Sequence, residues 1–452
     1  MTASRLVVRT QKKPLHGSVP VPSDRSITHR ALILAALSNG PCELRGFGYG
    51  SDNLRMLGAL AALGVRYEDD GRGTLKLRGV GLGGLVAPSA PIDCGRSPTC
   101  LRLLTGVLAA QPFASRLEGH GALEHLRMHG VLDPLRARGA RLSGRPVPAH
   151  AGEETAPIDA AGVTPGERLK PLTYALQHAS DHAKGALLLS GLFASGPTIV
   201  EEPVVSRDHT ERLLSALGMP IRAAASVLSL HPPADPLAIR GFDFDVPGDI
   251  SAAAFLAVAA QIVPDSHVTT RRTGLNPTRS GILEIIRLAG GRMGITPAGN
   301  SLGEPFGEVT SRGSVLRGIS IGGELALRGM DEIPAACVLA ARARGVTHVT
   351  DVAELRDDQP DRIAAIAGLL RAFGVGASER PDGLVIEGRP EQPLTAARVS
   401  SGGDHRIAMC AAVLGLVADG ETVVEDADCL AVSFPRFVGT LRSLGAEIEV
   451  VR

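Results

Sequence analysis

Six helix-like stretches along this chain end in glycine and lead into a short polar strand. The glycines are Gly64, Gly139, Gly218, Gly291, Gly374 and Gly445. Neighbouring glycines stand between 71 (445 − 374) and 83 (374 − 291) residues apart, so six copies account for all 452 residues. Glycine suits the residue after a helix because the chain turns there through positive φ. A fixed internal period indicates one repeated supersecondary unit, and this length suits a small βα module better than a solenoid repeat.

Length and composition restrict the class of protein. A chain of 452 residues is too long for one ordinary core, so two or three domains are expected. Aromatic residues are scarce, with no Trp and 3 Tyr, so Ala, Leu, Val and Ile must build the core. The formal net charge is zero, which provides no overall field for nucleic acid or an acidic membrane. We therefore expect a globular protein that binds neither.

The cysteines and the apolar runs indicate in which cellular compartment the protein is located. The six cysteines form no Cys-x-x-Cys pair and have no histidine cluster beside them, so reduced buried thiols are expected rather than a metal site or disulfides. The longest apolar stretch, 250–263, is too short to cross a bilayer, and no secretory signal is visible. These features predict a cytoplasmic protein without a metal.

The repeat order predicts the domain organisation. Each unit is expected to contain a strand, a helix, a strand, a helix and short strands, and three units should pack around one centre. The best boundary between the two similar halves lies near Arg240-Gly241. The segment 149–166, rich in Pro and Glu, is expected to be a surface loop. Two similar halves leave a cleft between them, where a small-molecule site is expected.

Four predicted helix starts carry cations in or near their first turn. These cations are Arg25 and Arg30, Arg207 and Arg212, Arg362, and Arg406. A cation at a helix N-terminus opposes the helix dipole, at a cost of order ~0.5 kcal/mol, which a bound anion would offset. Ordinary capped helices or structural ion pairs explain each start about as well. The four together favour sites for phosphate or carboxylate groups.

Four strings carry a resemblance to a known family. They are 206–211 (SRDHTE), 246–255 (VPGDISAAAF), 276–281 (NPTRSG) and 404–409 (DHRIAM). Read together, they resemble the EPSP synthase family, the shikimate-pathway enolpyruvyl transferases, over the whole chain. The resemblance implies an α/β fold of two domains, each an inside-out barrel of three βαβαββ units. The first domain would span 22–240, and the second would combine 1–21 with 241–452.

The resemblance also implies a reaction. The family moves the carboxyvinyl group of phosphoenolpyruvate (PEP) to the 5-hydroxyl of shikimate 3-phosphate, in aromatic amino acid biosynthesis, without a cofactor. The chemistry requires cations for two anionic substrates, an acid for the PEP methylene and a base for the hydroxyl. The expected partners are thus a cyclitol substrate and PEP, and the expected oligomeric state is a monomer.

Several residues match the family's functional positions. By this resemblance Asp331 contacts the accepting hydroxyl, and Arg362 and Arg406 bind PEP. The positions that bind shikimate 3-phosphate hold Ser26, Arg30, Ser180 and Ser206.

Other positions depart from the family pattern. Arg25 replaces a Lys that binds substrate, Pro98 replaces a Gly beside PEP, and Leu126 replaces an Arg that binds PEP. Asp181 replaces a small residue next to the shikimate phosphate. His182 replaces a Gln that lies between the two substrates.

The largest departures are Asp358, in place of a Lys, and Gln359, in place of the catalytic Glu. A glutamine cannot transfer a proton as glutamate does, and such transfer typically contributes ~100- to 10,000-fold in rate. Two unit charges ~4 Å apart interact by roughly 4 kcal/mol at intermediate dielectric, so a Lys-to-Asp exchange beside a phosphate is severe. Together with Asp181, these changes remove positive charge from the phosphate site.

These departures favour an enzyme of the family that acts on shikimate 3-phosphate or a shikimate-like cyclitol with altered or lost PEP chemistry, such as elimination or dehydration in a specialised pathway. Asp181 and Asp358 would suit a hydroxyl or an ammonium. His182 would be the acid/base because imidazole titrates near neutrality, although a hydrogen-bonded cleft histidine is the other interpretation. The alternatives are an authentic divergent EPSP synthase and a non-catalytic binding protein. A UDP-sugar enolpyruvyl transferase shares the fold, but the strings at Ser26 and Asp404 argue against it.

Overall fold

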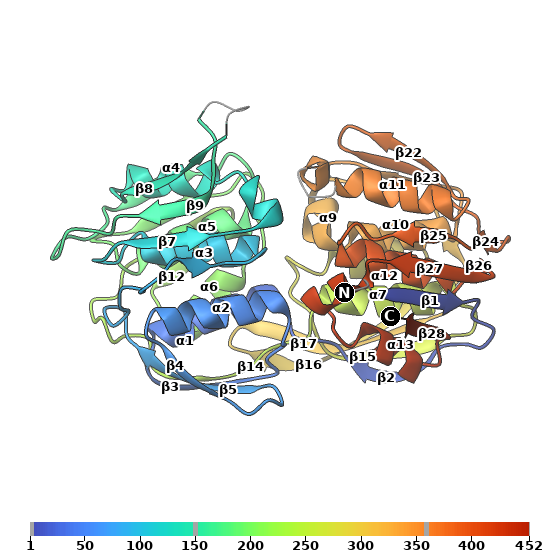
Figure 1. Cartoon of the computed structure of the whole chain (residues 1–452), viewed down its shortest axis with the longest axis horizontal. Helices are drawn as coiled ribbons and strands as arrows, with labels where there is room; N and C mark the ends of the chain where they lie inside the picture. Colours follow the sequence, from blue (N-terminus) through green and yellow to red (C-terminus); the bar gives the residue numbers. More distant parts are fainter. Residues whose placement is uncertain (1–3, 148–151, 357–360, 452) are drawn as a thin grey trace. The chain divides into compact units, whose positions relative to one another are not determined.

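The computed structural model describes residues 4–147, 152–356 and 361–451, which form two compact units (Figure 1). Unit 1 contains Met1–Pro22, Pro247–Gly299 and Pro305–Arg452. Unit 2 contains Ser23–Val246 and Asn300–Glu304. Each unit has its own hydrophobic core. No helix among the described residues is long and apolar enough to span a membrane.

The described residues of unit 2 form three four-stranded sheets of one topology. The first two strands of each sheet are parallel, and the remaining neighbours are antiparallel. In sheet order, the strands are β14 (Asp243–Asp245), β3 (Asn39–Arg45), β5 (Thr74–Val80) and β4 (Arg66–Asp69); β6 (Ile92–Asp93), β7 (Ser115–Glu118), β9 (Glu154–Ala160) and β8 (Leu142–Pro146); and β10 (Leu172–Ala175), β11 (Thr198–Glu201), β13 (Val227–Leu230) and β12 (Ile221–Ala224).

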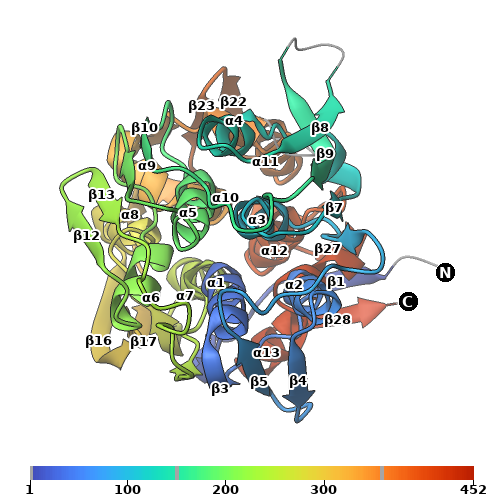
Figure 2. The same ribbon diagram turned by 90° about the vertical axis from the view of Figure 1, so that its left-hand side faces the viewer.

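Among the residues described in unit 2, three interior helices fill its centre and three further helices accompany them. Figure 2 looks onto this unit and shows α1, α3 and α5 side by side, with the strands around them. The helices are α1 (Arg25–Leu37), α2 (Ser51–Ala62), α3 (Pro98–Leu108), α4 (His129–Ala137), α5 (Asp181–Gly191) and α6 (His209–Ala216). The chain order β10, α5, β11, α6, β12, β13 is the βαβαββ unit that the repeat predicts.

Unit 1 repeats this architecture, and the part of it that the structure describes has three four-stranded sheets and two short strand pairs. In sheet order, the strands are β2 (His16–Pro20), β15 (His267–Gly274), β17 (Glu304–Arg312) and β16 (Arg292–Ser301); β19 (Ser320–Ile321), β21 (Val346–Val349), β23 (Gly383–Glu387) and β22 (Gly376–Arg380); β25 (Arg398–Ser400), β27 (Glu421–Glu425), β1 (Arg5–Arg9) and β28 (Ile448–Val451); and the pairs β18 (Leu316–Arg317) with β20 (Ala343–Arg344) and β24 (Leu394–Thr395) with β26 (Ala418–Asp419). With unit 2, this makes six four-stranded sheets among the described residues, as the six repeats predict.

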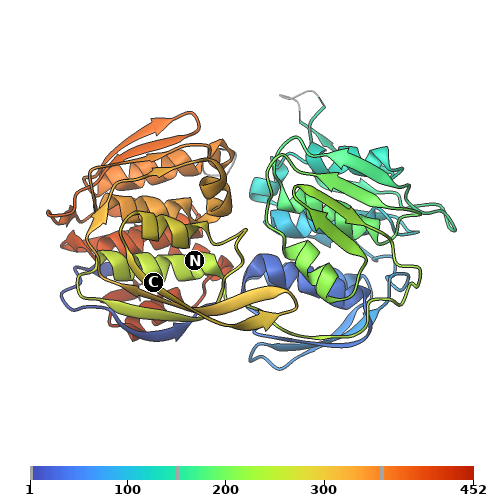
Figure 3. The same cartoon turned by 180° about the vertical axis from the view of Figure 1, so that it is seen from behind.

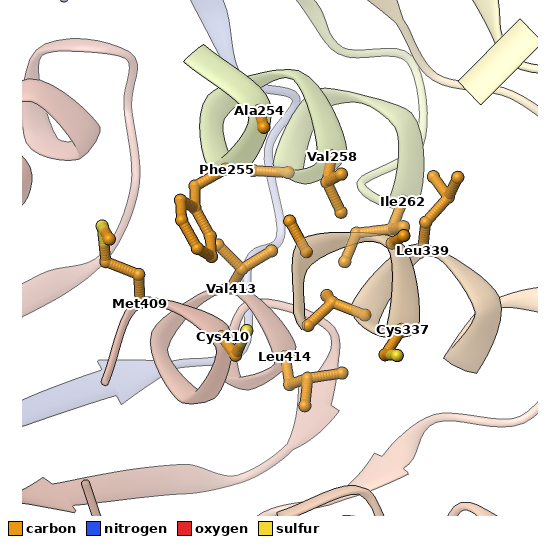
Figure 4. Packing of buried hydrophobic residues seen from close by; sticks show 14 of the residues in the cluster. Ala254, Phe255, Val258, Ile262, Cys337, Leu339, Met409, Cys410, Val413 and Leu414 are labelled. Carbon is orange, nitrogen blue, oxygen red and sulfur yellow. The ribbon is translucent and has the colours of Figure 1, made fainter. Parts of the chain in front are cut away.

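The interior helices of unit 1 are apolar on every side. Its helices are α7 (Ile250–Ile262), α8 (Gly281–Leu288), α9 (Gly323–Arg328), α10 (Ile333–Ala341), α11 (Arg362–Ala372), α12 (His405–Gly415) and α13 (Phe437–Ser443). Every residue of α7 and of α10 is buried. Side chains of α7, α10 and α12 meet in the core, among them Phe255, Cys337 and Val413 (Figure 4). Figure 3 shows the unit from behind, with α7 in yellow-green. A helix that is apolar all round belongs inside a core.

The glycine turns occur where the repeat places them. They follow the last turns of α2, α4, α6, α8, α11 and α13, and their φ angles range from 77° to 98°. At the fourth turn, Gly290 adopts the positive φ of 86°, rather than the neighbouring Gly291. A side chain with a Cβ would be strained at each of these positions. The prediction of six glycine-terminated helices is therefore confirmed.

One expectation about the chain's organisation needs correction, and the boundary between the units can be given to the residue. The boundary lies between Val246 and Pro247, a few residues after the expected Arg240-Gly241, because β14 pairs with β3 and stays in unit 2. The segment 149–166 is not simply a surface loop. Strand β9 lies within it, pairs with both β7 and β8, and buries Ala156 and Ile158. Its pairing with β7 and β8 outweighs the Pro and Glu content that suggested a loop.

The contact between α3 and α5 provides a test of this packing. A Cβ added at Gly106 would stand 2.3 Å from the carbonyl oxygen of Ala186 and 2.7 Å from its Cα. Gly106→Ala is therefore expected to push the two helices apart and lower the free energy of unfolding by about 1–3 kcal/mol. Denaturant titration followed by circular dichroism measures this change.

Gly58, in α2, is the matched control because no heavy atom lies within 4 Å of its added Cβ. Gly58→Ala should raise the free energy of unfolding by about 0.5–1 kcal/mol, since alanine restricts the unfolded chain and favours helix. Equal effects of the two substitutions would contradict the close approach of α3 and α5.

Candidate active site

Each unit gathers polar and charged side chains at the N-terminal ends of its interior helices. In unit 2 they lie at the starts of α1 and α5, and in unit 1 at the start of α12 and at the turn Met330–Glu332 that precedes α10. These ends present backbone N–H groups and a partial positive charge, which suit anions and carboxylate caps.

The start of α1 is capped by a side chain. Asp24 accepts a hydrogen bond from the backbone N–H of Ile27 at 2.9 Å, and the helix begins at Arg25. The guanidinium of Arg25 pairs with Asp52, in the first turn of α2, at 2.9 Å. The cation that stands in place of the family's lysine thus has an internal carboxylate partner.

Arg30 is the central cation of the unit 2 group, and its guanidinium is 1% exposed. Its Nη1 donates to the Oγ and the carbonyl oxygen of Ser26 at 2.6 and 3.0 Å, and its Nε donates to the Oγ1 of Thr210 at 2.8 Å. Its Nη2 donates to the carboxylate and the carbonyl oxygen of Asp181 at 2.9 and 3.2 Å. These five hydrogen bonds use all five N–H groups of the guanidinium.

Asp181 neutralises Arg30. Burial by itself would raise the pKa of Asp181, but the surrounding positive charges outweigh it and hold that pKa below its usual range. His182 is one of these neighbours when it is protonated, and Arg30 and Arg207 are permanently charged. Asp181 is therefore an ionised carboxylate at neutral pH.

His182 is a neutral hydrogen-bonding group. Its Nε2 lies 2.9 Å from the Oγ1 of Thr99, and its Nδ1 lies 3.5 Å from Nη1 of Arg102. Because a guanidinium only donates, Nδ1 accepts, which leaves the proton on Nε2. Burial lowers the pKa of His182 to about 4. The expectation that this imidazole titrates near neutrality, as an acid/base would, is therefore corrected.

The two remaining serines of unit 2 are engaged in different ways. Ser180 caps α5, where its Oγ accepts from the backbone N–H of Ala183 at 3.2 Å. Ser206 donates a short hydrogen bond from its Oγ to the carboxylate of Glu202. Glu202 in turn pairs at 2.8 Å with Lys184, which is 1% exposed and also contacts Glu211 at 2.7 Å. A buried ion cluster thus fixes the position of Ser206.

In unit 1 the carboxylate of Asp331 lies between two arginines. Its Oδ1 is 2.7 Å from Nη2 of Arg406, whose Nε also donates to the Asp331 carbonyl oxygen at 3.1 Å. Its Oδ2 is 3.3 Å from Nη2 of Arg279. The side chain of Asp331 is 25% exposed, so it remains accessible while it is held from both sides.

Arg279 belongs to a buried network that sequence reasoning missed. It pairs with Glu332 at 2.6 Å and donates to the Oγ of Ser251 at 2.6 Å, and Ser251 donates a short hydrogen bond to Glu332. Ser251 and Arg279 lie in the strings 246–255 and 276–281, and Glu332 directly follows Asp331. Both strings carry the family resemblance, but the sequence by itself indicates no role for Arg279 or Ser251.

The second predicted PEP ligand has a carboxylate partner as well. Nε of Arg362 lies 2.8 Å from Oδ2 of Asp404, which also caps α12 by accepting from the N–H of Arg406 at 2.7 Å. Burial opposes the ionisation of Asp404, but Arg362 and the other positive neighbours hold its pKa well below its usual range. The predicted helix starts at Arg362 and His405 are thus confirmed.

The remaining departures from the family pattern are placed as follows. Pro98 is the first residue of α3. Leu126 packs, partly buried, against the core of unit 2. Asp358 and Gln359 lie outside the described residues, so the predictions that rest on them are untested.

Comparison with known proteins identifies the family. The model of the family EPSP synthase (3-phosphoshikimate 1-carboxyvinyltransferase) matches residues 9–441. The chain belongs to the EPSP synthase family. Its fold and its class of enzyme, the enolpyruvyl transferases, agree with what the resemblance implied.

Relatives and solved structures are similar along the whole chain. Proteins named 3-phosphoshikimate 1-carboxyvinyltransferase from Geobacter sp. (strain M21) and Syntrophotalea carbinolica are 43% and 44% identical, over 95% and 94% of this chain and 96% and 95% of theirs. One from Acidithiobacillus ferrooxidans is 42% identical over 99% of both chains. A solved EPSP synthase from Acinetobacter baumannii is 34% identical, with a TM-score of 0.88 over 99% of this chain and 100% of that one.

The environment of His182 predicts a pH effect on stability. Because the pKa of His182 falls from the ordinary histidine value of 6.5 to about 4 in the folded chain, the unfolded chain binds more protons between these values. Folding stability is therefore lost as pH falls from about 6.5 toward 4. The free energy of unfolding should fall between pH 7 and pH 5 in the unsubstituted chain. In the His182→Gln variant this fall should be smaller by roughly 1–2 kcal/mol.

Urea unfolding at both pH values measures the difference. His178→Gln, which replaces an exposed histidine just before α5, is the control and should behave as the unsubstituted chain. If His182→Gln showed the same loss as the unsubstituted chain, the burial of a neutral His182 would be disproved.

Proposed function

We propose that this enzyme is a 3-phosphoshikimate 1-carboxyvinyltransferase of aromatic amino acid biosynthesis, which transfers the carboxyvinyl group of PEP to the 5-hydroxyl of shikimate 3-phosphate. The observation that carries the proposal is similarity of 42–44% identity, over at least 94% of the chain, to proteins of that name. Neither the relatives nor the described residues indicate altered PEP chemistry. The carboxyvinyltransferase therefore replaces the hypothesis of altered or lost PEP chemistry.

The unit 1 residues would handle PEP and the hydroxyl. Arg362 and Arg406 would donate to the anionic groups of PEP, competing with Asp404 and Asp331 for the guanidinium N–H groups. Asp331, held from both sides and still accessible, would accept the hydroxyl proton as that oxygen attacks C2 of PEP. Loss of inorganic phosphate from C2, together with a proton from the methyl group formed at C3, then restores the double bond. The acid that protonates the methylene is unassigned, because Gln359 cannot transfer a proton.

The unit 2 residues would hold the phosphorylated ring. Ser26, Ser180 and Ser206 offer hydroxyl groups, and Arg30 offers a guanidinium. A phosphate can gain a direct hydrogen bond from Arg30 only by displacing one of its present acceptors, of which Asp181 is the charged one. Binding of the phosphorylated substrate would therefore weaken the Arg30–Asp181 pair.

One observation favours a second candidate function. All five N–H groups of Arg30 are used inside the unit, and Asp181 adds an ionised carboxylate. A carboxylate repels a phosphate but accepts hydrogen bonds from hydroxyl or ammonium groups. The second candidate is therefore an enzyme of the same family that acts on a shikimate-like cyclitol without a phosphate.

A phosphate-release assay tests the proposal. Purified enzyme mixed with PEP and shikimate 3-phosphate should release inorganic phosphate at roughly 1–1000 per second. Asp331→Asn should lower this rate by ~100- to 10,000-fold, because asparagine cannot accept the hydroxyl proton. Asp419→Asn, which removes an exposed carboxylate of the same unit, is the control and should leave the rate unchanged.

Thermal-shift measurements separate the two candidates. Phosphate release, together with stabilisation by shikimate 3-phosphate, supports the carboxyvinyltransferase. No phosphate release, together with stabilisation by shikimate but not by its phosphate, would defeat it and support the second candidate.

A further inference from the structure

A basic cavity of about 300 Å³ lies in unit 2, where the C-terminal end of α4 meets the segment that leads to β10. Its volume is at the lower end of the range for small-molecule sites. The charged residues that line it are Arg138, Arg141, Glu167, Arg168 and Lys170. Four of these five side chains are cations, and none of the five is among the residues matched to family functions.

Arg138 is a buried cation without a counter-charge. It is fully buried, and its five N–H groups donate to the carbonyl oxygens of Lys170 and Leu187 and to the hydroxyls of Ser190 and Thr198. No described carboxylate forms an ion pair with it. Burial lowers the pKa of Arg138 to about 10, still far above neutrality, so the charge persists. Buried charges in proteins are normally paired, and an unpaired one needs an explanation.

The other three cations have N–H groups that donate to no described protein acceptor. Arg141 uses Nε and Nη2 on the carbonyl oxygen of Gly162, and Arg168 uses Nε on the carbonyl oxygen of Phe193. Within the described part of the chain, Nη1 of Arg141, both Nη atoms of Arg168 and Nζ of Lys170 donate to no protein acceptor. Glu167 likewise forms no ion pair with any described residue. Arg141, Arg168 and Lys170 are exposed, so the cavity combines N–H donors that face solvent with an excess of positive charge.

We propose that this cavity binds a small phosphate-bearing anion. Forked guanidinium groups and an ammonium match phosphate oxygens in geometry and charge, and a multiply charged anion would offset the charge of Arg138. The cavity suits inorganic phosphate or diphosphate.

The site is separate from the candidate active site, and the proposal does not depend on the proposed function. Arg138 contacts the carbonyl oxygen of Leu187 and the Oγ of Ser190, in the last turns of α5. Asp181 and His182 lie in the first turn of the same helix, which at 11 residues is roughly 15 Å long. An anion in the cavity would thus lie at the opposite end of α5 from the residues that bind Arg30.

Isothermal titration with inorganic phosphate and with diphosphate, at constant ionic strength set by sodium chloride, tests the proposal. We expect saturable binding of at least one of them to the full chain. The triple variant R141Q/R168Q/K170Q should weaken that binding by about tenfold or more, because three charge-assisted contacts are removed. Phosphate bound at the candidate active site would not respond to these substitutions.

The matched control is the triple variant R66Q/K76Q/R222Q, which removes the same charge from exposed positions of unit 2. It should bind phosphate as the unsubstituted chain does. The proposal is overturned if neither anion binds, if the two triple variants weaken binding equally, or if neither weakens it.

Discussion

Pairing of buried arginines with carboxylates from distant segments is the interaction on which both groups of functional residues depend. Arg30 pairs with Asp181, and Arg279 pairs with Glu332, each at hydrogen-bonding distance and with little solvent. A buried charge is costly unless it is paired and hydrogen-bonded, so each arginine requires its partner. The pairs therefore tie α1 to α5 in unit 2, and tie the segments before α8 and α10 to each other in unit 1. They also set the charge that a substrate meets.

The apolar interior explains why these charges gather where they do. Helices such as α7 and α10 have no polar face, so charge can be accommodated only at their ends, near the surface. Carboxylate caps satisfy the N–H groups there, as Asp24, Asp249 and Asp404 do. The same N-terminal ends favour anionic ligands. Fold and candidate site thus arise from one feature, the stacking of apolar helices with polar starts.

Much of the architecture can be predicted from the sequence, because its signals are local. The glycine period predicts six units, and caps such as Asp404 predict where helices begin. Pairing between distant segments has no local signal. Nothing in the sequence indicates that Arg30 takes as its partner Asp181, 151 residues away, or that Arg279 reaches Glu332. Strand β9 was missed for a similar reason: its partners β7 and β8, not its own composition, make it a strand. Residue type and family position indicated His182, but its neutral state depends on burial, which only the fold reveals.

A double-mutant cycle on Arg30 and Asp181 tests the central claim most directly. The free energy of unfolding is measured for Arg30→Met, for Asp181→Asn, for the double variant and for the unsubstituted chain, all without ligand. Each single substitution should cost about 3–5 kcal/mol, because it leaves a buried group without its partner. The double substitution should cost less than the sum of the two by more than about 1 kcal/mol. Additive effects would show that the two side chains do not depend on each other and would contradict this account of the site.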